Sequence, residues 1–229
     1  MARSVLRIGA SLALVIFPLM FMLVFALHVE SPAELFELKW QHDPYVAADI
    51  MAGLSDIPRA QRYYVLPHMV GYLSMPFLIA AALSLGCILF RMRPWWAIVG
   101  ATMTCVGAVF MAGMLAMWLA FAAIGNVPGE HVPGATAALE ALIEMQGPLL
   151  YSTILTGFSL LGMMVLAVGL FLSGVVPKWT AVLIFIGCLM MTLFIDLDNL
   201  MFTGAFLTFC GMAPIARMLF KGEFGTSPF

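Results

Sequence analysis

The chain has 229 residues, of which 63% are hydrophobic and only 10% are charged, and its mean hydropathy is +1.06. A water-soluble domain carries about a quarter charged residues, so this composition excludes a soluble globular protein and indicates an integral-membrane protein. The net charge of −2 and the scattered basic residues also exclude nucleic acid as a partner.

Six apolar segments have the length of a membrane-spanning helix, roughly 17 to 25 residues. In chain order they are residues 8–29, 67–90, 95–124, 148–176, 179–195 and 200–219. The first is longer than the apolar core of a signal peptide, so we expect it to be retained. The sequence therefore predicts one integral-membrane domain over residues 1–229, an all-α bundle of six transmembrane helices.

The charges predict the orientation of these spans. With the N-terminus inside, seven of the ten basic residues lie on the inner side and only Lys39, Arg59 and Arg62 lie outside. Basic residues concentrate on the cytoplasmic side of membrane proteins. We therefore expect both termini in the cytoplasm, with the protein in the inner membrane of a bacterium; eleven of the twelve acids fall on the outer side.

Two polar connections lie on that outer side. In residues 30–66, Ser31-Pro32-Ala33-Glu34 resembles a capping box, Leu35, Phe36, Leu38 and Trp40 supply an apolar side, and Asp43-Pro44 precedes a second stretch that ends near Gly53. In residues 125–147, turn residues lead into a helix over 135–146, with Ala138, Leu139, Leu142 and Ile143 on one side. Short amphipathic helices are expected to cover the outer end of the bundle.

The middle of the chain contains an apparent repeat. An offset of 83 residues aligns Gly86 with Gly169, Leu89 with Leu172, Pro94 with Pro177, Trp96 with Trp179 and Cys105 with Cys188. The pattern predicts a parallel repeat of two hairpins, residues 67–124 and 148–197. The alternative is that Pro and Trp recur because both suit a helix start at the membrane interface.

The second span carries the main candidate site. His68, Tyr72 and Met75 follow one another at i, i+4 and i+7, and Pro76 next to them predicts a kink. With Tyr151 at the outer end of the fourth span, they form the candidate ligand-binding set. The simpler interpretation of His68 is a headgroup-level side chain in an aromatic belt.

A metal site is the other reading of the outer residues. Imidazole and carboxylate ligands suit several transition metals, and the candidate ligands are His68, Asp196, Asp198, Glu140 and Glu144. The simpler alternatives are helix capping by Asp198 or Asn199 and a solvated face for the glutamate pair. A haem, if present, would be a single outer one, because all four histidines fall on the outer side.

The remaining polar and sulfur-containing residues favour packing over chemistry. No acidic or basic residue lies in the middle of a span, the four cysteines form no CxxC pair, and the 19 methionines are dispersed. Glycines at Gly100, Gly107, Gly113, Gly157, Gly162, Gly204 and Gly211 predict close helix contacts, and Thr156, Ser159, Thr192 and Thr208 are expected to hydrogen-bond across helices.

The segment Gly174-Val175-Val176-Pro177-Lys178-Trp179-Thr180-Ala181-Val182-Leu183 resembles the inner hairpin of small bacterial integral-membrane proteins of the domain of unknown function 4386 kind. The resemblance covers mainly residues 67–220 and implies a membrane bundle without an activity to transfer. The long outer segment 30–66 departs from the short first loop of that group.

The sequence leads to three functional hypotheses. The first is a non-enzymatic protein that acts by packing or binding, either as an accessory subunit of a membrane complex or as a receptor for an apolar, lipid-like ligand at the outer leaflet. The second is an outer-face metal- or haem-dependent enzyme or redox protein, and the third is a small-solute transporter. Membrane lipids are the expected partners, with other membrane subunits or a second copy of the chain as alternatives.

Overall fold

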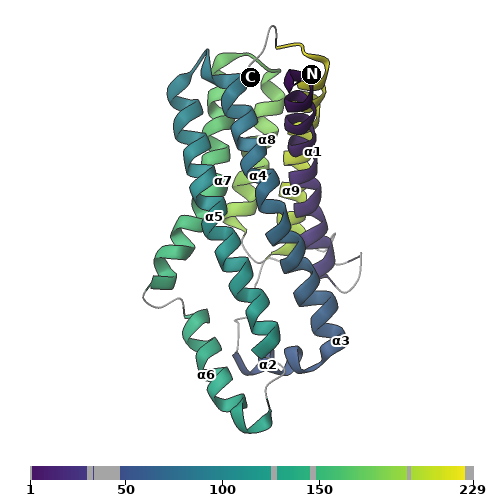
Figure 1. Ribbon diagram of the computed structural model, residues 1–229, viewed down its shortest axis with the longest axis vertical. Coiled ribbons are helices and arrows are strands. Elements are labelled where there is room, and N and C mark those ends of the chain that lie inside the picture. Colours follow the sequence, from purple (N-terminus) through teal and green to yellow (C-terminus); the bar gives the residue numbers. More distant parts are fainter. Residues whose placement is uncertain are drawn as a thin grey trace.

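A computed structural model describes residues 2–29, 33, 47–124, 128–144, 148–194 and 197–224, and the elements that it describes are helices (Figure 1). Six of them build the bundle: α1 (Ala2–His28), α4 (Leu66–Phe90), α5 (Pro94–Ile124), α7 (Pro148–Ser173), α8 (Lys178–Leu193) and α9 (Asp198–Lys221). These ranges match the six apolar segments to within a few residues, except that α1 begins six residues earlier. The all-α class and the helical bundle are confirmed.

Five helices of the described chain are long and apolar enough to cross a membrane, which identifies a multi-pass membrane protein. The sixth helix of the bundle, α8, is also apolar but has only 16 residues. At 1.5 Å per residue, α8 is about 24 Å long, less than the ~30 Å of a hydrocarbon core. Length and hydropathy therefore support five of the six expected spans, and the expectation that α8 crosses the membrane stays a prediction.

The six helices form a closed ring. Each packs on its neighbour in the order α1, α4, α5, α7, α8, α9, and α9 returns to α1; α4 also touches α7 across the ring. Both chain ends lie at one end of the bundle, at the top of Figure 1. We call this the terminal end and the opposite end the distal end.

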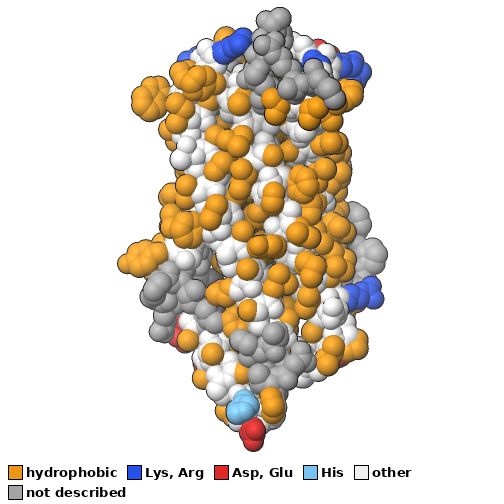
Figure 2. Space-filling view, in the orientation of Figure 1, with side chains coloured by type: hydrophobic (Ala, Val, Ile, Leu, Met, Phe, Trp, Pro, Cys, Tyr) orange, Lys and Arg blue, Asp and Glu red, His pale blue; other side chains and the backbone are white. Residues whose placement is uncertain are grey.

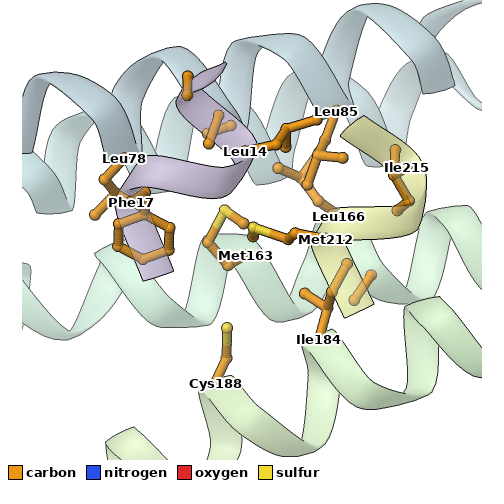
Figure 3. Close-up of a cluster of buried hydrophobic side chains, with 14 of the residues drawn as sticks. Leu14, Phe17, Leu78, Leu85, Met163, Leu166, Ile184, Cys188, Met212 and Ile215 are labelled. Carbon is orange, nitrogen blue, oxygen red and sulfur yellow. The ribbon is translucent and has the colours of Figure 1, made fainter. Parts of the chain in front are cut away.

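The centre of the ring is filled by apolar side chains. Leu14, Phe17, Leu78, Leu85, Met163, Leu166, Ile184, Met212 and Ile215 are fully buried there, together with Cys188 (Figure 3). The four cysteines are free thiols, as expected for packing residues. The described core of the bundle is therefore packed with apolar side chains, as is usual in protein interiors.

Glycines bring α5 and α7 into backbone contact. A Cβ atom at Gly162 would lie 2.6 Å from the carbonyl oxygen of Gly100, and one at Gly107 would overlap the backbone of Ser159. The α8–α9 pair is similar, because a Cβ at Gly204 would lie 2.7 Å from the carbonyl oxygen of Gly187. Small residues at such crossings let two helices approach closely.

Two expectations about packing are wrong in part. Gly113 and Gly157 have open space around them rather than a neighbouring helix. The four hydroxyls expected to bond across helices donate to carbonyl oxygens of their own helix, three or four residues earlier: Thr156 to Ser152, Ser159 to Thr156, Thr192 to Cys188 and Thr208 to Gly204. Thr208 of α9 also has a side-chain hydrogen bond with the thiol of Cys188 on α8, so the expectation holds for this hydroxyl. A carbonyl of the preceding turn is always within reach of a helical Ser or Thr, whereas a partner on another helix is not.

The short helices at the distal end agree partly with expectation. The helices α2 (Ala47–Ser55) and α6 (Val132–Ile143) lie within a few residues of the predicted short helices. They pack on each other. The predicted capping box, apart from Ala33, and the apolar side from Leu35 to Trp40 lie outside the described residues, as does the Asp43-Pro44 cap. The repeat of two hairpins stays a prediction.

The helix that contains α4 begins well before Pro67. The short helix α3 (Ile57–Ala60) continues through a π-helical turn (η2, Gln61–Val65) into α4, so that a single helix runs over 34 residues. Proline lacks an N–H, and its ring crowds the carbonyl four residues earlier. A π turn directly before Pro67 is a local adjustment to both effects, with the Leu66 N–H bonded to the Gln61 carbonyl.

Candidate functional site

Polar and aromatic side chains gather at the distal end, where α1 finishes, α9 starts and the π turn enters α4. His28 is the last residue of α1, Asp198 is the first residue of α9, and His68 lies in the first turn of α4. Three segments that are far apart in sequence therefore contribute side chains to one place.

His28 and Asp198 are in direct contact. The His28 Nδ1 atom lies 3.3 Å from a carboxylate oxygen of Asp198, and the two side chains are 24% and 34% exposed. The carboxylate at the N-terminus of α9 opposes the partial positive charge of that helix end, and the imidazole at the C-terminus of α1 does the equivalent when it is protonated. The contact thus ties the first and last helices together at the distal end.

This contact corrects the expected role of Asp198. The residue preceding α9 is Leu197, and it provides no side-chain cap to the helix. Asp198 is already inside the first turn and directs an oxygen to His28. A contact with a side chain from α1 was invisible to an argument based on local sequence.

His68 is held in a defined orientation. Its Nδ1 atom lies 2.7 Å from the carbonyl oxygen of Tyr64. Because a carbonyl only accepts, Nδ1 is the donor in this hydrogen bond, and in the neutral ring the lone pair is then on Nε2. His68 can therefore offer an acceptor or a metal-ligating nitrogen at Nε2.

Three aromatic side chains of different origin surround His68. Its ring centroid lies 5.3 Å from that of His28 in an edge-on arrangement, 4.6 Å from Tyr64 and 6.2 Å from Trp118. Trp118 comes from the last turns of α5, and its ring lies 5.6 Å from Phe121. Such spacings are typical of aromatic pairs that stabilise one another.

This group rests on a second, smaller apolar core. Phe121 is buried with Met51 and Leu54 of α2 and Leu139 of α6, and Tyr64 and Trp118 pack against them. We call these residues the distal cluster. The amphipathic helices predicted for the outer end therefore support Tyr64 and Trp118, the ring neighbours of His68.

The predicted ligand-binding residues do not share one surface. His68 is half-buried, Tyr72 is 44% exposed and Met75 is only 2% exposed, within the central core. Tyr151 is 69% exposed on α7. Because a helix has 3.6 residues per turn, residues at i, i+4 and i+7 do not lie exactly above one another. Here the angular offset places Tyr72 on the outside of the bundle and Met75 on the inside.

The predicted metal ligands are also separated. Asp196 lies outside the described residues. Glu140 and Glu144 are exposed on and just after α6. Among the described residues, no three His, Cys, Asp or Glu side chains gather closely enough to hold a metal ion, although His68 and Asp198 both neighbour His28.

Sequence reasoning missed His28, Tyr64 and Trp118 as neighbours of His68. Tyr64 precedes His68 by four residues, so its proximity was available from helical spacing once the helix was extended before Pro67. His28 and Trp118 lie on other helices and give no such signal. Their common position near the outer ends of predicted spans was the only available indication.

Charge divides the molecule along its axis. Most of the Lys and Arg side chains visible in Figure 2 lie at the terminal end, and a further basic group lies toward the distal end, where acidic side chains and a histidine are also seen. Hydrophobic side chains cover the surface between them (Figure 2). This distribution matches a bundle whose middle is embedded in lipid.

Comparisons with family models, with curated proteins and with solved structures find no match to this chain. The resemblance to the domain of unknown function 4386 group therefore stays a prediction that rests on its quoted residues.

Proposed function

We propose that the chain is a six-span protein of a bacterial inner membrane, with both termini in the cytoplasm, that acts without catalysis as a receptor for an apolar, lipid-like ligand at the outer leaflet. The basic terminal end supports this orientation, because cytoplasmic ends of membrane proteins are rich in Lys and Arg. The distal end would then face outward.

The observation that carries the proposal is the group formed by His68 with Tyr64, Trp118, His28 and Asp198. Aromatic rings offer an apolar surface, and the polar atoms beside them fix the orientation of a ligand. In this arrangement the ligand's hydroxyl donates to Nε2 of His68 while its hydrocarbon part lies against the rings. The exposed Tyr72 one turn along α4 extends the apolar surface toward lipid.

A surface role is favoured by the composition of the central core. The buried polar side chains of the described core are mainly hydroxyls, and those of Ser74, Ser84, Thr104 and Thr208 bond to their own helix. A solute that crosses the membrane needs polar groups along its path. Binding from the side or from the distal end needs none.

The direct test is photo-crosslinking in native membranes with a diazirine-bearing fatty alcohol, followed by mapping of the labelled peptides. Label is expected on the start of α4 and the end of α5. His68→Leu is expected to lower labelling about two- to ten-fold, the effect of losing one hydrogen bond. Met69→Leu, on the exposed neighbouring position, is the matched control.

Two results would contradict the receptor proposal. One is label spread evenly over all lipid-facing helices, which is the pattern of bulk lipid. The other is equal labelling of the His68→Leu and Met69→Leu proteins. Mass determination in native lipid addresses the accessory-subunit alternative, which predicts a complex larger than one chain.

The second candidate is the outer-face metal- or haem-dependent enzyme or redox protein. It is favoured by one observation, the neighbouring imidazoles of His28 and His68 with Asp198 in contact with the former. Metal analysis and an absorption spectrum of the purified protein separate the two. Stoichiometric metal or a Soret band, lost in His68→Leu, would support this candidate over the receptor.

A further inference from the structure

An apolar groove lies between α7 and α8 near the terminal end. It has a volume of about 170 Å³ and is lined by Ala167, Val168 and Phe171 of α7 and by Ala181, Val182 and Phe185 of α8. The two alanines are buried and form the floor, while Phe171 and Val182 are partly exposed at its rim. Small floor residues between larger walls leave the groove open to the side of the bundle.

A positive charge stands at the mouth of this groove. The Nζ atom of Lys178 lies 5.2 Å from the centre of the Phe171 ring, one of the groove walls. Ammonium groups favour the faces of aromatic rings, so the contact holds the charge over the groove. Lys178 makes no ion pair within the described part of the chain, where the terminal-end acid Glu223 contacts Lys221 at 3.9 Å.

The position along the bundle suits the membrane interface. Lys178 starts α8, and Trp179 beside it is 53% exposed. Tryptophan and lysine at a helix end mark the level of lipid headgroups. The groove runs from this level into the part of the bundle that faces the hydrocarbon.

We infer that the groove binds an anionic phospholipid of the leaflet at the terminal end, with an acyl chain against Ala167 and Ala181 and the phosphate on Lys178. An apolar cavity of about 150 Å³ holds a benzene molecule, so this groove accommodates a comparable length of hydrocarbon. Basic pockets between transmembrane helices on the cytoplasmic side bind anionic headgroups. Charge complementarity therefore selects an anionic phospholipid over a neutral one. This site lies at the opposite end from His68 and does not depend on the receptor proposal.

Native mass spectrometry of the full chain with added phosphatidylglycerol or phosphatidylcholine of identical acyl chains tests the inference. The wild-type protein is expected to retain phosphatidylglycerol preferentially. Lys178→Gln is expected to weaken that retention about five-fold, the factor that corresponds to about 1 kcal/mol per basic side chain near a membrane surface. Arg217→Gln, an exposed basic residue of α9, is the charge control.

A second pair of variants tests the groove itself. Val182→Trp fills the groove and is expected to lower retention of both lipids, whereas Ile186→Trp, equally exposed on α8 but outside the groove, leaves retention unchanged. Equal retention of the two lipids by the wild-type protein would overturn the inference. Equal effects of Lys178→Gln and Arg217→Gln would also overturn it, because they indicate general surface charge. If the wild-type protein forms a dimer that Val182→Trp dissociates while lipid retention is unchanged, the inference is overturned and the groove is an interface between copies.

Discussion

At the scale of single residues, backbone contact distinguishes the glycines that matter from those that do not. Gly107 faces the backbone of Ser159 across the α5–α7 crossing, whereas Gly113, six residues later on α5, faces open space. The sequence presents both as small residues in an apolar helix. Only the position of a second helix separates them, so the sequence predicted the type of contact without its location.

Gly107→Ala is expected to destabilise the protein by about 1–3 kcal/mol, because the added methyl group forces α5 and α7 apart. Gly113→Ala is expected to be neutral or to stabilise by up to about 1 kcal/mol, the gain in helix propensity. Unfolding in mixed micelles by titration with SDS measures both values. Equal changes in the two proteins would contradict the close crossing.

Asp198→Asn tests the contact between α1 and α9. The substitution keeps the shape of the side chain and removes its charge beside His28. When the His28 ring is protonated, a loss of about 0.2–1 kcal/mol in unfolding free energy is expected for this partly exposed pair. The loss is expected to shrink at high salt, where such pairs are screened. Glu140→Gln, an exposed acid of α6, serves as control. A salt-independent loss would point to a role other than the ionic contact.

The candidate site could be predicted only in part from single residues of the sequence. His68 was identifiable because a histidine near a span is uncommon and needs an explanation. Its partners Tyr72 and Met75 were assigned from helical spacing, and the structure turns them to opposite environments. Sequence spacing predicts which residues share a face of a helix, but the neighbouring helices determine which of those residues are buried.

At the scale of elements, hydropathy predicted the long helices well and their beginnings less well. The ranges of α5, α7, α8 and α9 follow directly from apolar runs, because lipid demands continuous backbone hydrogen bonding. The sequence predicts a helix start at Pro67, whereas the structure extends the helix of α4 back to Ile57. A π turn lets the helix pass a proline, and hydropathy carries no sign of it.

The short helices α2 and α6 pack on each other in a separate apolar cluster. Leu139 is fully buried in the distal cluster, which shares no buried residue with the central core. Leu139→Ala is expected to lower the local stability of α2 and α6 by about 2–5 kcal/mol and leave the bundle unchanged.

Hydrogen exchange followed by mass spectrometry measures this local effect. Amides of α2 and α6 are expected to exchange at least about thirty-fold faster in Leu139→Ala, since each 1.4 kcal/mol is a factor of ten. Ala138→Ser, on the adjacent exposed position, is expected to change little. Faster exchange throughout α5 and α7 as well would show that the distal cluster and the bundle unfold as one.

At the scale of the whole molecule, the low content of charge has a clear spatial meaning. The charged side chains visible in Figure 2 lie toward the two ends of an apolar bundle, with basic groups mainly at the terminal end and acidic groups mainly at the distal end. A closed ring of six helices with a filled centre leaves the ends and the lipid-facing grooves as places for binding. Composition predicted the membrane environment, whereas the closure of the ring through α1 and α9 required the three-dimensional structure.

Labelling of single introduced cysteines in intact cells with a membrane-impermeant maleimide tests the orientation on which the receptor proposal depends. Ser55→Cys and Ala138→Cys report the distal end, Met92→Cys and Lys178→Cys report the terminal end, and the parent protein serves as the blank. We expect the two distal positions to be labelled in intact cells and the two terminal positions only after permeabilisation. Labelling of Met92→Cys or Lys178→Cys in intact cells, or protection of both distal positions until permeabilisation, would contradict the proposed orientation.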